Sequence, residues 1–351
     1  MTTLGIMSDT ADEAEYEWLG KAASAAGFRD ALLFTPEDVD WTSRRISGWV
    51  FDSSGCVFRS GLPFPPLLYD KGIYKDRSRI RNAVKVKRLS GITFIGEWLG
   101  NNKWSIQQQL MKNRQFRPHL IPSAPLANVA AVQSMLQKHK RLILKPVSTH
   151  EGAGIIMLYQ TNGLIHLREN MKPGRQLPQG KLACAIQELK ADGRQYLIQK
   201  WMPFQDRDGR PYDIRVLVQK NSKGRWQVTG MGIRQGEEGM LTSNLATGGR
   251  TLEVLPFLVS LFGAAKASLI EEQLRSLTPK LALHLERSTG KRLVELGLDF
   301  GIDRRGHVWL IEANTKPGKK VLEQLGPPEA YMDSLQLPVS FAGYLLRRSV
   351  P

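Results

Sequence analysis

The segment LVELGLDFGIDRRGHVWLIEANT, residues 293–315, places the strongest constraint on the fold of this chain. It holds two mainly apolar runs joined by DRRG, and two strands with so short a connection pair in the antiparallel sense. In the tightest such hairpin Arg304 and Arg305 are the two turn residues, which sets Asp299 opposite Leu310. The sequence therefore predicts an antiparallel hairpin with a defined register.

Three oxygen-bearing side chains share one face in that register. Opposed residues lie on the same face, and side chains return to it at every second position, so Asp299, Glu312 and Asn314 project together. A lone acid at a strand end usually faces water. Clustered carboxylates instead favour a hard cation, and Mg²⁺ prefers oxygen ligands. We predict a magnesium site here, on the condition that no β-bulge changes the parity of either strand.

Other segments indicate a mixed fold. A short apolar strand, TLGIM, precedes a helical segment over 11–26 that ends at Gly27, which is typical of a small α/β unit. Two more helices are expected, over 98–116 and ending near His139. Strand-like runs separated by glycine then follow, at 141–147, 155–159, 196–202, 212–220, 225–234, 293–302 and 307–313. The pattern predicts an α+β fold, or an α/β fold with hairpins.

Composition narrows the classes of function. A chain of 351 residues is long enough for two or three packed units. Its start lacks the features of a secretory signal, and its most apolar later stretch is interrupted by Pro256, Gly263 and Lys266, so we expect no membrane insertion. Cys56 and Cys184 have neither metal-type spacing nor the pattern of a disulfide framework, which favours a cytoplasmic protein.

Much of the formal charge of +16 sits in residues 69–89. This segment contains Lys71, Lys75, Arg77, Arg79, Arg81, Lys85, Lys87 and Arg88. Such a run is most often a solvated helix face, but it also suits docking of an acidic peptide or polymer. No nucleic-acid fingerprint accompanies it, so we do not expect a nucleic-acid partner.

A glycine-containing turn offers a phosphate site. In RLILKPVSTHEGAGIIML a strand ends at Lys145, and Ser148, Thr149, Gly152 and Gly154 precede the next strand. Glycine allows the backbone to approach a phosphate closely, and lysine supplies a positive charge. Most such turns are simple hairpins, and this one matches neither a Walker loop nor a dinucleotide-binding fingerprint.

A further apolar strand, YLIQKWMPF at 196–204, ends in polar and apolar residues before a proline. An ordinary core strand is one interpretation. The other is a slot for a nucleotide base, with Gln199, Lys200 and Met202 at its edge.

The order of these motifs resembles that of the ATP-grasp superfamily. The series comprises a lysine before a glycine loop, the strand with a hinge, the strand PYDIRVLV, the segment GMGIRQGEEGMLTSNLATGG and the final LGLDFGID…VWLIEANTKPG. The resemblance covers about residues 96 to 330 and is strongest to the YheC/YheD-type ATP-grasp proteins, which are described as endospore coat-associated. It implies two α+β subdomains that grip ATP, after a small α/β N-terminal domain. We therefore divide the chain into units at 1–95, 96–205 and 206–351.

The resemblance also implies roles for individual residues. Lys103 and Lys145 would bind nucleotide phosphates, with residues from Ser148 to Gly154 as a cover. The base would lie at the hinge, where Gln and Lys replace the acid that many relatives carry. Asp299, Glu312 and Asn314 match the magnesium ligands. Arg215, Arg234 and Asn244 match residues that handle the transferred phosphoryl group and the substrate.

The implied reaction is ATP- and Mg²⁺-dependent ligation. A substrate carboxylate would attack the γ-phosphate of ATP, and an amine would displace the phosphate from the resulting acyl phosphate. The residue pattern identifies neither the carboxylate nor the amine. A phosphotransferase with the same nucleotide site and a non-catalytic spore-coat scaffold are the alternatives. Association with the spore or with coat proteins is implied by the resemblance alone.

Overall fold

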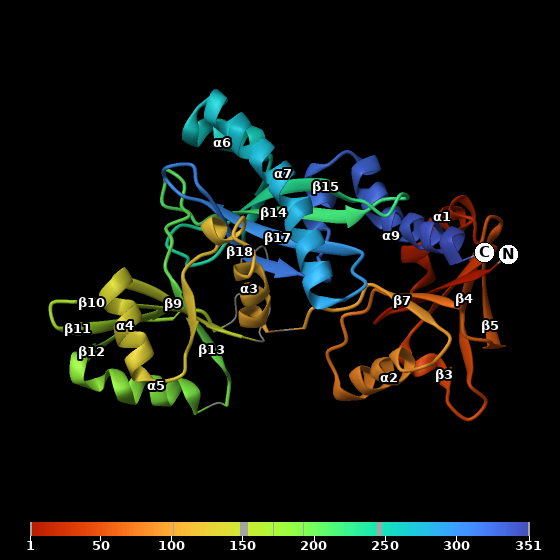
Figure 1. Ribbon diagram of the computed structural model, residues 1–351, viewed down its shortest axis with the longest axis horizontal. Helices are drawn as coiled ribbons and strands as arrows, with labels where there is room; N and C mark the ends of the chain where they lie inside the picture. Colours follow the sequence, from red (N-terminus) through yellow and green to blue (C-terminus); the bar gives the residue numbers. More distant parts are fainter. Residues whose placement is uncertain are drawn as a thin grey trace.

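The structure, a computed structural model, describes residues 2–100, 102–147, 154–170, 172–191, 193–243 and 248–349. Three β-sheets follow one another along the chain. In Figure 1 the N-terminal sheet lies on the right, the last sheet in the middle and the second sheet on the left. None of the described helices is long and apolar enough to cross a membrane.

The N-terminal sheet has seven strands, in the order β3-β4-β2-β1-β6-β7 with β5 paired to β4. Its inner strands are parallel: β1 pairs with β2 and β6, and β6 pairs with β7. The strands are β1 (Thr3–Met7), β2 (Asp30–Phe34), β3 (Val39–Asp40), β4 (Arg45–Asp52), β5 (Gly55–Leu62), β6 (Leu67–Asp70) and β7 (Thr93–Ile95). The helices of this part are α1 (Leu19–Ala26) and α2 (Arg77–Lys87).

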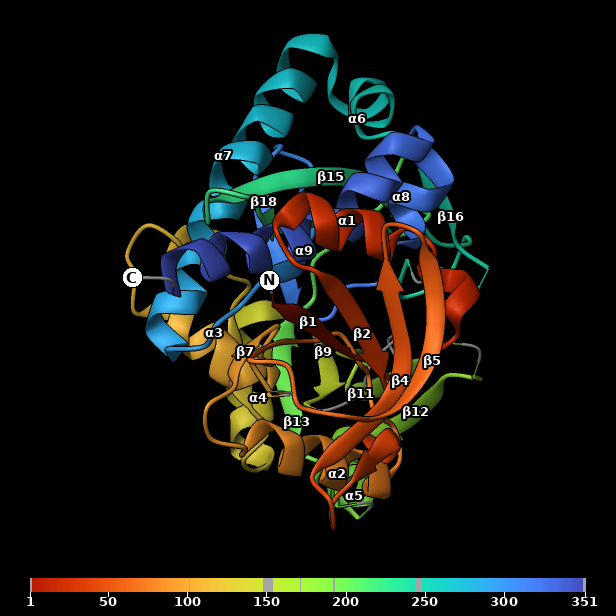
Figure 2. The ribbon, with the colours of Figure 1, turned by 90° about the vertical axis from the view of Figure 1, so that its right-hand side faces the viewer.

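The C-terminal helix α9 (Pro328–Ser349) returns to this N-terminal sheet. Figure 2 shows α9 beside α1. Leu19 and Ala23 of α1 share an apolar cluster with Val339, Phe341 and Ala342 of α9. The two ends of the chain are thus joined in one hydrophobic core.

The second sheet is antiparallel, with six strands in the order β12-β11-β10-β9-β13-β8. Its strands are β8 (Ser123–Pro125), β9 (Arg141–Pro146), β10 (Ile156–Thr161), β11 (Leu164–Glu169), β12 (Arg175–Pro178) and β13 (Tyr196–Lys200). Helices α4 (Val129–His139) and α5 (Leu182–Lys190) pack on it. Every buried member of this core lies between Leu126 and Ile198, so the sheet has a core of its own.

The third sheet is antiparallel, with five strands in the order β16-β15-β14-β17-β18. Its strands are β14 (Tyr212–Lys220), β15 (Trp226–Gln235), β16 (Arg250–Leu252), β17 (Glu295–Ile302) and β18 (Val308–Asn314). The apolar face packs against α3 (Lys103–Met111), α6 (Val254–Phe262) and α7 (Ala264–Thr289), and α8 (Lys320–Leu325) lies near β15. Short 3-10 helices complete the chain at Glu13–Tyr16, Pro36–Asp38, Arg117–His119 and Gln179–Lys181.

All eight strand segments expected from the sequence, TLGIM included, are present, each within two residues of its expected ends. Several of the strands that were not foreseen are short or only partly apolar, such as β12 with its sequence RQLP. The helix expected over 11–26 is shorter, because a 3-10 helix, Glu13–Tyr16, precedes α1. The division into three units stays a prediction, and two helices cross it: α3 packs with the third sheet and α9 with the first.

The register predicted for the hairpin of β17 and β18 is wrong, by one residue next to the turn and by two residues at Asp299. Ile302 pairs with Val308. The turn between the two strands contains Gly306 in the left-handed conformation, with a φ of +82°. A two-residue turn would have needed positive φ at one or both arginines, which is unfavourable for residues with a Cβ.

A β-bulge at Ile311 then adds a second shift and sets Asp299 directly opposite Glu312, with Gly297 opposite Asn314. Each shift alone would have moved the acids to opposite faces, but the two together preserve the shared face.

Candidate functional site

The predicted site residues meet in one cleft of about 1250 Å³ that residues from all three sheets and their loops line. The lining includes Lys103, Lys145, Gln199, Lys200, Met202, Arg215, Arg234, Asp299, Glu312 and Asn314. Gly154 precedes the lining residue Ile155 and takes a φ of +72°, which favours glycine. Four residues of the prediction, Ser148, Thr149, Gly152 and Asn244, lie outside the described residues.

Strand register arranges the charged residues in a row across the third sheet. Arg234 on β15 pairs with Asp213 on β14, while Arg215 on β14 pairs with Asp299 on β17, which in turn pairs with Glu312. Arg215 Nε lies 2.6 Å from Asp299 Oδ1, and Arg234 Nη2 lies 2.9 Å from Asp299 Oδ2. Arg234 Nε also donates to Asp213 Oδ1 at 2.7 Å. The floor of the cleft is therefore a network of two arginines and two acids, with Glu312 at its edge.

Burial and the neighbouring arginines shift the pKa values of the two acids of this network in opposite directions. Burial opposes ionisation of Asp299, but the guanidinium groups of Arg215 and Arg234 outweigh it and lower the pKa of this carboxyl. Burial raises the pKa of Asp213 despite the attraction of Arg234, and the nearby Asp299 adds to the rise. Burial disfavours the charge on Arg234, yet the two carboxylates raise its pKa, so the guanidinium stays positive. Ser243, an unforeseen member of the site, donates its hydroxyl hydrogen to Asp213.

The predicted magnesium ligands form a donor set that suits a hard cation. Asp299 and Glu312 supply carboxylate oxygens and Asn314 an amide oxygen from the same face of the hairpin. Asp299 Oδ1 is buried and accepts no hydrogen bond, because its contact with Arg215 Nε lacks hydrogen-bond geometry. Glu312 Oε1 lies 3.6 Å from Lys103 Nζ. These residues fit Mg²⁺, and their role as ligands stays a prediction. Asn314 belongs to the predicted set, and the described residues hold no metal-binding group made of three His, Cys, Asp or Glu side chains alone.

Two lysines face this floor from other elements. Lys103 is the first residue of α3, and Asn102 caps that helix by accepting hydrogen bonds from the backbone N–H groups of Trp104 and Ser105. Lys145 lies near the end of β9, opposite Leu197 of β13. Burial, together with the positive charge of Lys103, lowers the pKa of Lys145 to about 8, although Glu312 and Asp299 oppose the change.

The hinge residues line the cleft beside an arrangement that was not foreseen. Gln199 is buried and donates its side-chain N–H to Ser123 Oγ at 3.0 Å. The Arg141 guanidinium lies 5.5 Å from the ring centroids of both Tyr159 and Trp201. Arg141, Tyr159 and Trp201 are separated in the sequence, and the pairing of β9 with β10 and β13 brings them together.

The fold is the ATP-grasp fold, as its likeness to solved structures shows. The D-cycloserine synthetase DcsG aligns over 99% of both chains with a TM-score of 0.55 and 14% sequence identity. An ATP-grasp ligase associated with ribosomally synthesised peptides from Chryseobacterium gregarium, solved with ADP and a leader and core peptide, aligns over 99% of this chain and 98% of its own with a TM-score of 0.55 and 11% identity. The predicted fold class is thereby confirmed.

Within this class, the chain belongs to the YheC/D-like ATP-grasp family, whose model matches residues 91–345. It is 27% identical over 338 residues to the endospore coat-associated protein YheC of Bacillus subtilis strain 168, covering 94% of this chain and 92% of that protein. The family resemblance inferred from the sequence motifs is confirmed.

Proposed function

We propose that this protein is an ATP- and Mg²⁺-dependent carboxylate–amine ligase. The observation that carries the proposal is the network of two arginines and two acids on β14, β15 and β17, with Glu312 of β18 at its edge, which faces Lys103 and Lys145 across the cleft. Phosphoryl transfer depends mainly on positioning and on neutralising charge, and this arrangement supplies both. The similarity to a ligase solved with ADP supports nucleotide binding in the cleft.

The reaction assigns different tasks to different parts of the site. A carboxylate oxygen of the substrate attacks the γ-phosphorus of ATP, the bond from that phosphorus to the β–γ bridging oxygen breaks, and ADP leaves. The amine nitrogen then attacks the acyl carbon, inorganic phosphate leaves, and the amine loses a proton. Arg215 and Arg234 neutralise the transferred phosphoryl group, and the acids that hold them fix their positions.

Nucleotide and metal contacts complete this assignment. Lys145 and Lys103 bind phosphate oxygens, and Gln199, Lys200 and Met202 line the base end of the cleft. Asp299, Glu312 and Asn314 would hold Mg²⁺, which when bound neutralises phosphate charge as a Lewis acid.

The first test is calorimetric titration with Mg²⁺ and ATP, for the wild type and for Glu312→Gln. We expect magnesium-dependent binding that the variant weakens at least tenfold. Glu272→Gln, which makes the same change at an exposed position on α7, should bind like the wild type. Equal binding by both variants would refute the metal assignment.

A second test separates ligation from the other reactions of this fold. Hydroxylamine converts an acyl phosphate into a hydroxamate, so a panel of carboxylates with ATP and hydroxylamine should give hydroxamate and ADP in equal amounts. A stable phosphoester would instead identify a phosphotransferase. A folded protein that binds no nucleotide would support the scaffold alternative.

We further infer that the protein acts at the spore, in contact with coat proteins. The name of its relative YheC supports this inference. A fluorescent fusion followed through sporulation should collect at the developing spore, and an even distribution at all stages would contradict it.

A further inference from the structure

The N-terminal wall of the cleft carries an unusual group of exposed apolar side chains. Ile73, Ile80, Val84 and Trp98 are each 40–49% exposed, and all line the cleft. Single exposed apolar residues are ordinary on protein surfaces, but several on one concave surface indicate a binding site. None of them is needed for the nucleotide and metal contacts assigned above.

Helix α2 supplies two of these four apolar side chains. Ile80, Val84 and Lys87 are spaced by four and three residues, so they lie on one face of the helix, and all three line the cleft. Arg77, Arg81 and Arg88 form an exposed stripe immediately beside that face.

The stripe on α2 is left to solvent. The helix contains no acidic residue, its ion pairs engage Arg79 and Lys87, and Lys85 lies over the Trp41 ring. Among the described residues, the arginines of the stripe have no acidic partner. The apolar and basic surfaces of α2 are therefore continuous and available to a ligand.

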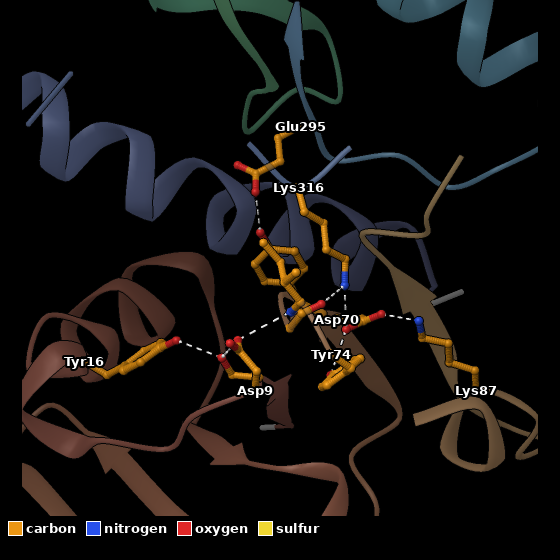
Figure 3. Close-up of polar contacts among 11 residues, drawn as sticks. Asp9, Tyr16, Asp70, Tyr74, Lys87, Glu295 and Lys316 are labelled. Atoms are coloured by element: carbon orange, nitrogen blue, oxygen red, sulfur yellow. Dashed lines mark hydrogen bonds and ion pairs between the residues drawn. The ribbon is translucent and has the colours of Figure 1, made fainter. Parts of the chain in front are cut away.

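A buried carboxylate fixes the inner end of the surface (Figure 3). Asp70 is 1% exposed, and the ammonium groups of Lys87 and Lys316 both contact it, the second at 2.9 Å. The Tyr74 hydroxyl donates to the same carboxylate at 3.0 Å. Two cations share one anion, so a net positive charge remains where the wall meets the floor of the cleft. Lys316 follows the predicted ligand Asn314 by two residues, which brings this charge next to the reacting region.

We propose that this wall, formed by α2 with Ile73, Trp98, Lys87 and Lys316, binds the carboxylate substrate as an acidic polypeptide segment that carries an apolar side chain among its acids. The proposal rests on the ligase function proposed above and names its substrate class. An apolar side chain of the peptide packs against Ile80 and Val84, a carboxylate reaches Lys87 and Lys316, and flanking acids contact the arginine stripe.

Size and surface chemistry favour a polypeptide over other ligands. The cleft also takes the nucleotide in the function proposed above, but Arg77, Arg81 and Arg88 lie outside its lining, so the binding surface continues beyond a pocket of roughly 300–1000 Å³ that would enclose a compact small molecule. Single-stranded nucleic acids need aromatic platforms for their bases, but most of this wall is aliphatic. A second copy of the chain is disfavoured by mutual repulsion at a net charge of +16.

Fluorescence anisotropy with a labelled peptide of repeating Glu-Glu-Leu units tests the proposal. The variant Arg77→Gln/Arg81→Gln/Arg88→Gln should bind it at least tenfold more weakly, with a shallower dependence on salt. The control Arg114→Gln/Arg304→Gln/Arg305→Gln removes the same charge from other exposed positions and should bind within twofold of the wild type. Equal losses in the two variants would overturn the proposal.

The apolar part of the surface needs a separate variant. Ile80→Ser/Val84→Ser should weaken binding of the Glu-Leu peptide several-fold and leave binding of an all-glutamate peptide of equal length unchanged. Equal effects on the two peptides would refute the apolar contact. A labelled oligonucleotide that competes at lower concentration than the peptide would also overturn the proposal.

Binding of Mg²⁺-ADP, measured in parallel, separates this inference from the proposed function. All of these variants should retain wild-type ADP affinity, which also reports that they fold. ADP binding without peptide binding would refute the polypeptide substrate alone. Peptide binding without any ADP binding would refute the ligase function, and with it the substrate role of the surface.

Discussion

Raising the pH should weaken nucleotide binding through Lys145. Burial lowers the pKa of this lysine to about 8, whereas an exposed lysine titrates near 10.5. A phosphate beside the ammonium group favours the charged form and raises the pKa again, so nucleotide binding takes up a proton. If only the charged form binds, the protonated fraction falls from about three quarters at pH 7.5 to about one eleventh at pH 9, and affinity falls about eightfold.

Calorimetry with Mg²⁺-ADP measures both consequences. Titrations at pH 8 in buffers of different ionisation enthalpy should show uptake of about half a proton per nucleotide bound. The Lys145→Arg variant is the control, because its guanidinium stays charged throughout this range, and its affinity should change little between pH 7.5 and 9. The reasoning is refuted if wild-type affinity is constant over this range or if the variant shows the same decline.

Three further changes test the network around this lysine. Lys103→Gln removes a positive charge that lowers the pKa of Lys145, so the midpoint of the affinity–pH curve should move above 8; an unchanged midpoint would contradict the assigned cause. Arg234→Met leaves two buried carboxylates without their shared partner and should lower the free energy of unfolding by about 3 kcal/mol in urea titrations, and a loss below about 1 kcal/mol would show that the carboxylates are solvated or protonated. Gly297→Ala places a Cβ 2.5 Å from Arg215 Nη1 and should cost about 1–3 kcal/mol, whereas Gly180→Ala, with open space at the Cβ, should be neutral.

The main strands and the shared face of the acids could be predicted from the sequence, because both follow from apolar runs and from the two-residue period of a strand. The register could not, since it depends on a bulge at Ile311 that no local pattern announces. The turn could have been better assigned. Glycine at the last position of DRRG favours a turn that ends in the left-handed conformation, as Gly306 adopts.

The residues whose roles could not be predicted from the sequence share one feature, because their contacts depend on how separate segments of the chain pack together. Asp213 was visible in the sequence as part of an Asp-x-Arg strand, but its bridge to Arg234 and Ser243 depends on pairing between β14 and β15. Asp70 gave no signal, because one of two acids in a strongly basic segment suggests a solvated position. Its burial beneath Lys87 and Lys316 requires contact between chain segments about 245 residues apart.

The self-contained core of the second sheet has a consequence for the release of products. The first sheet is joined to the third because α9 and Val294 belong to the apolar cluster of the first sheet. Among the described residues, the buried cluster of the second sheet includes no residue from the other two sheets. We therefore expect the sheet of β8–β13 to swing as one body while the other two stay together. A pair of fluorophores on α5 and α7 should report a distance that lengthens when ADP dissociates, and a pair on α1 and α7 should report a constant distance.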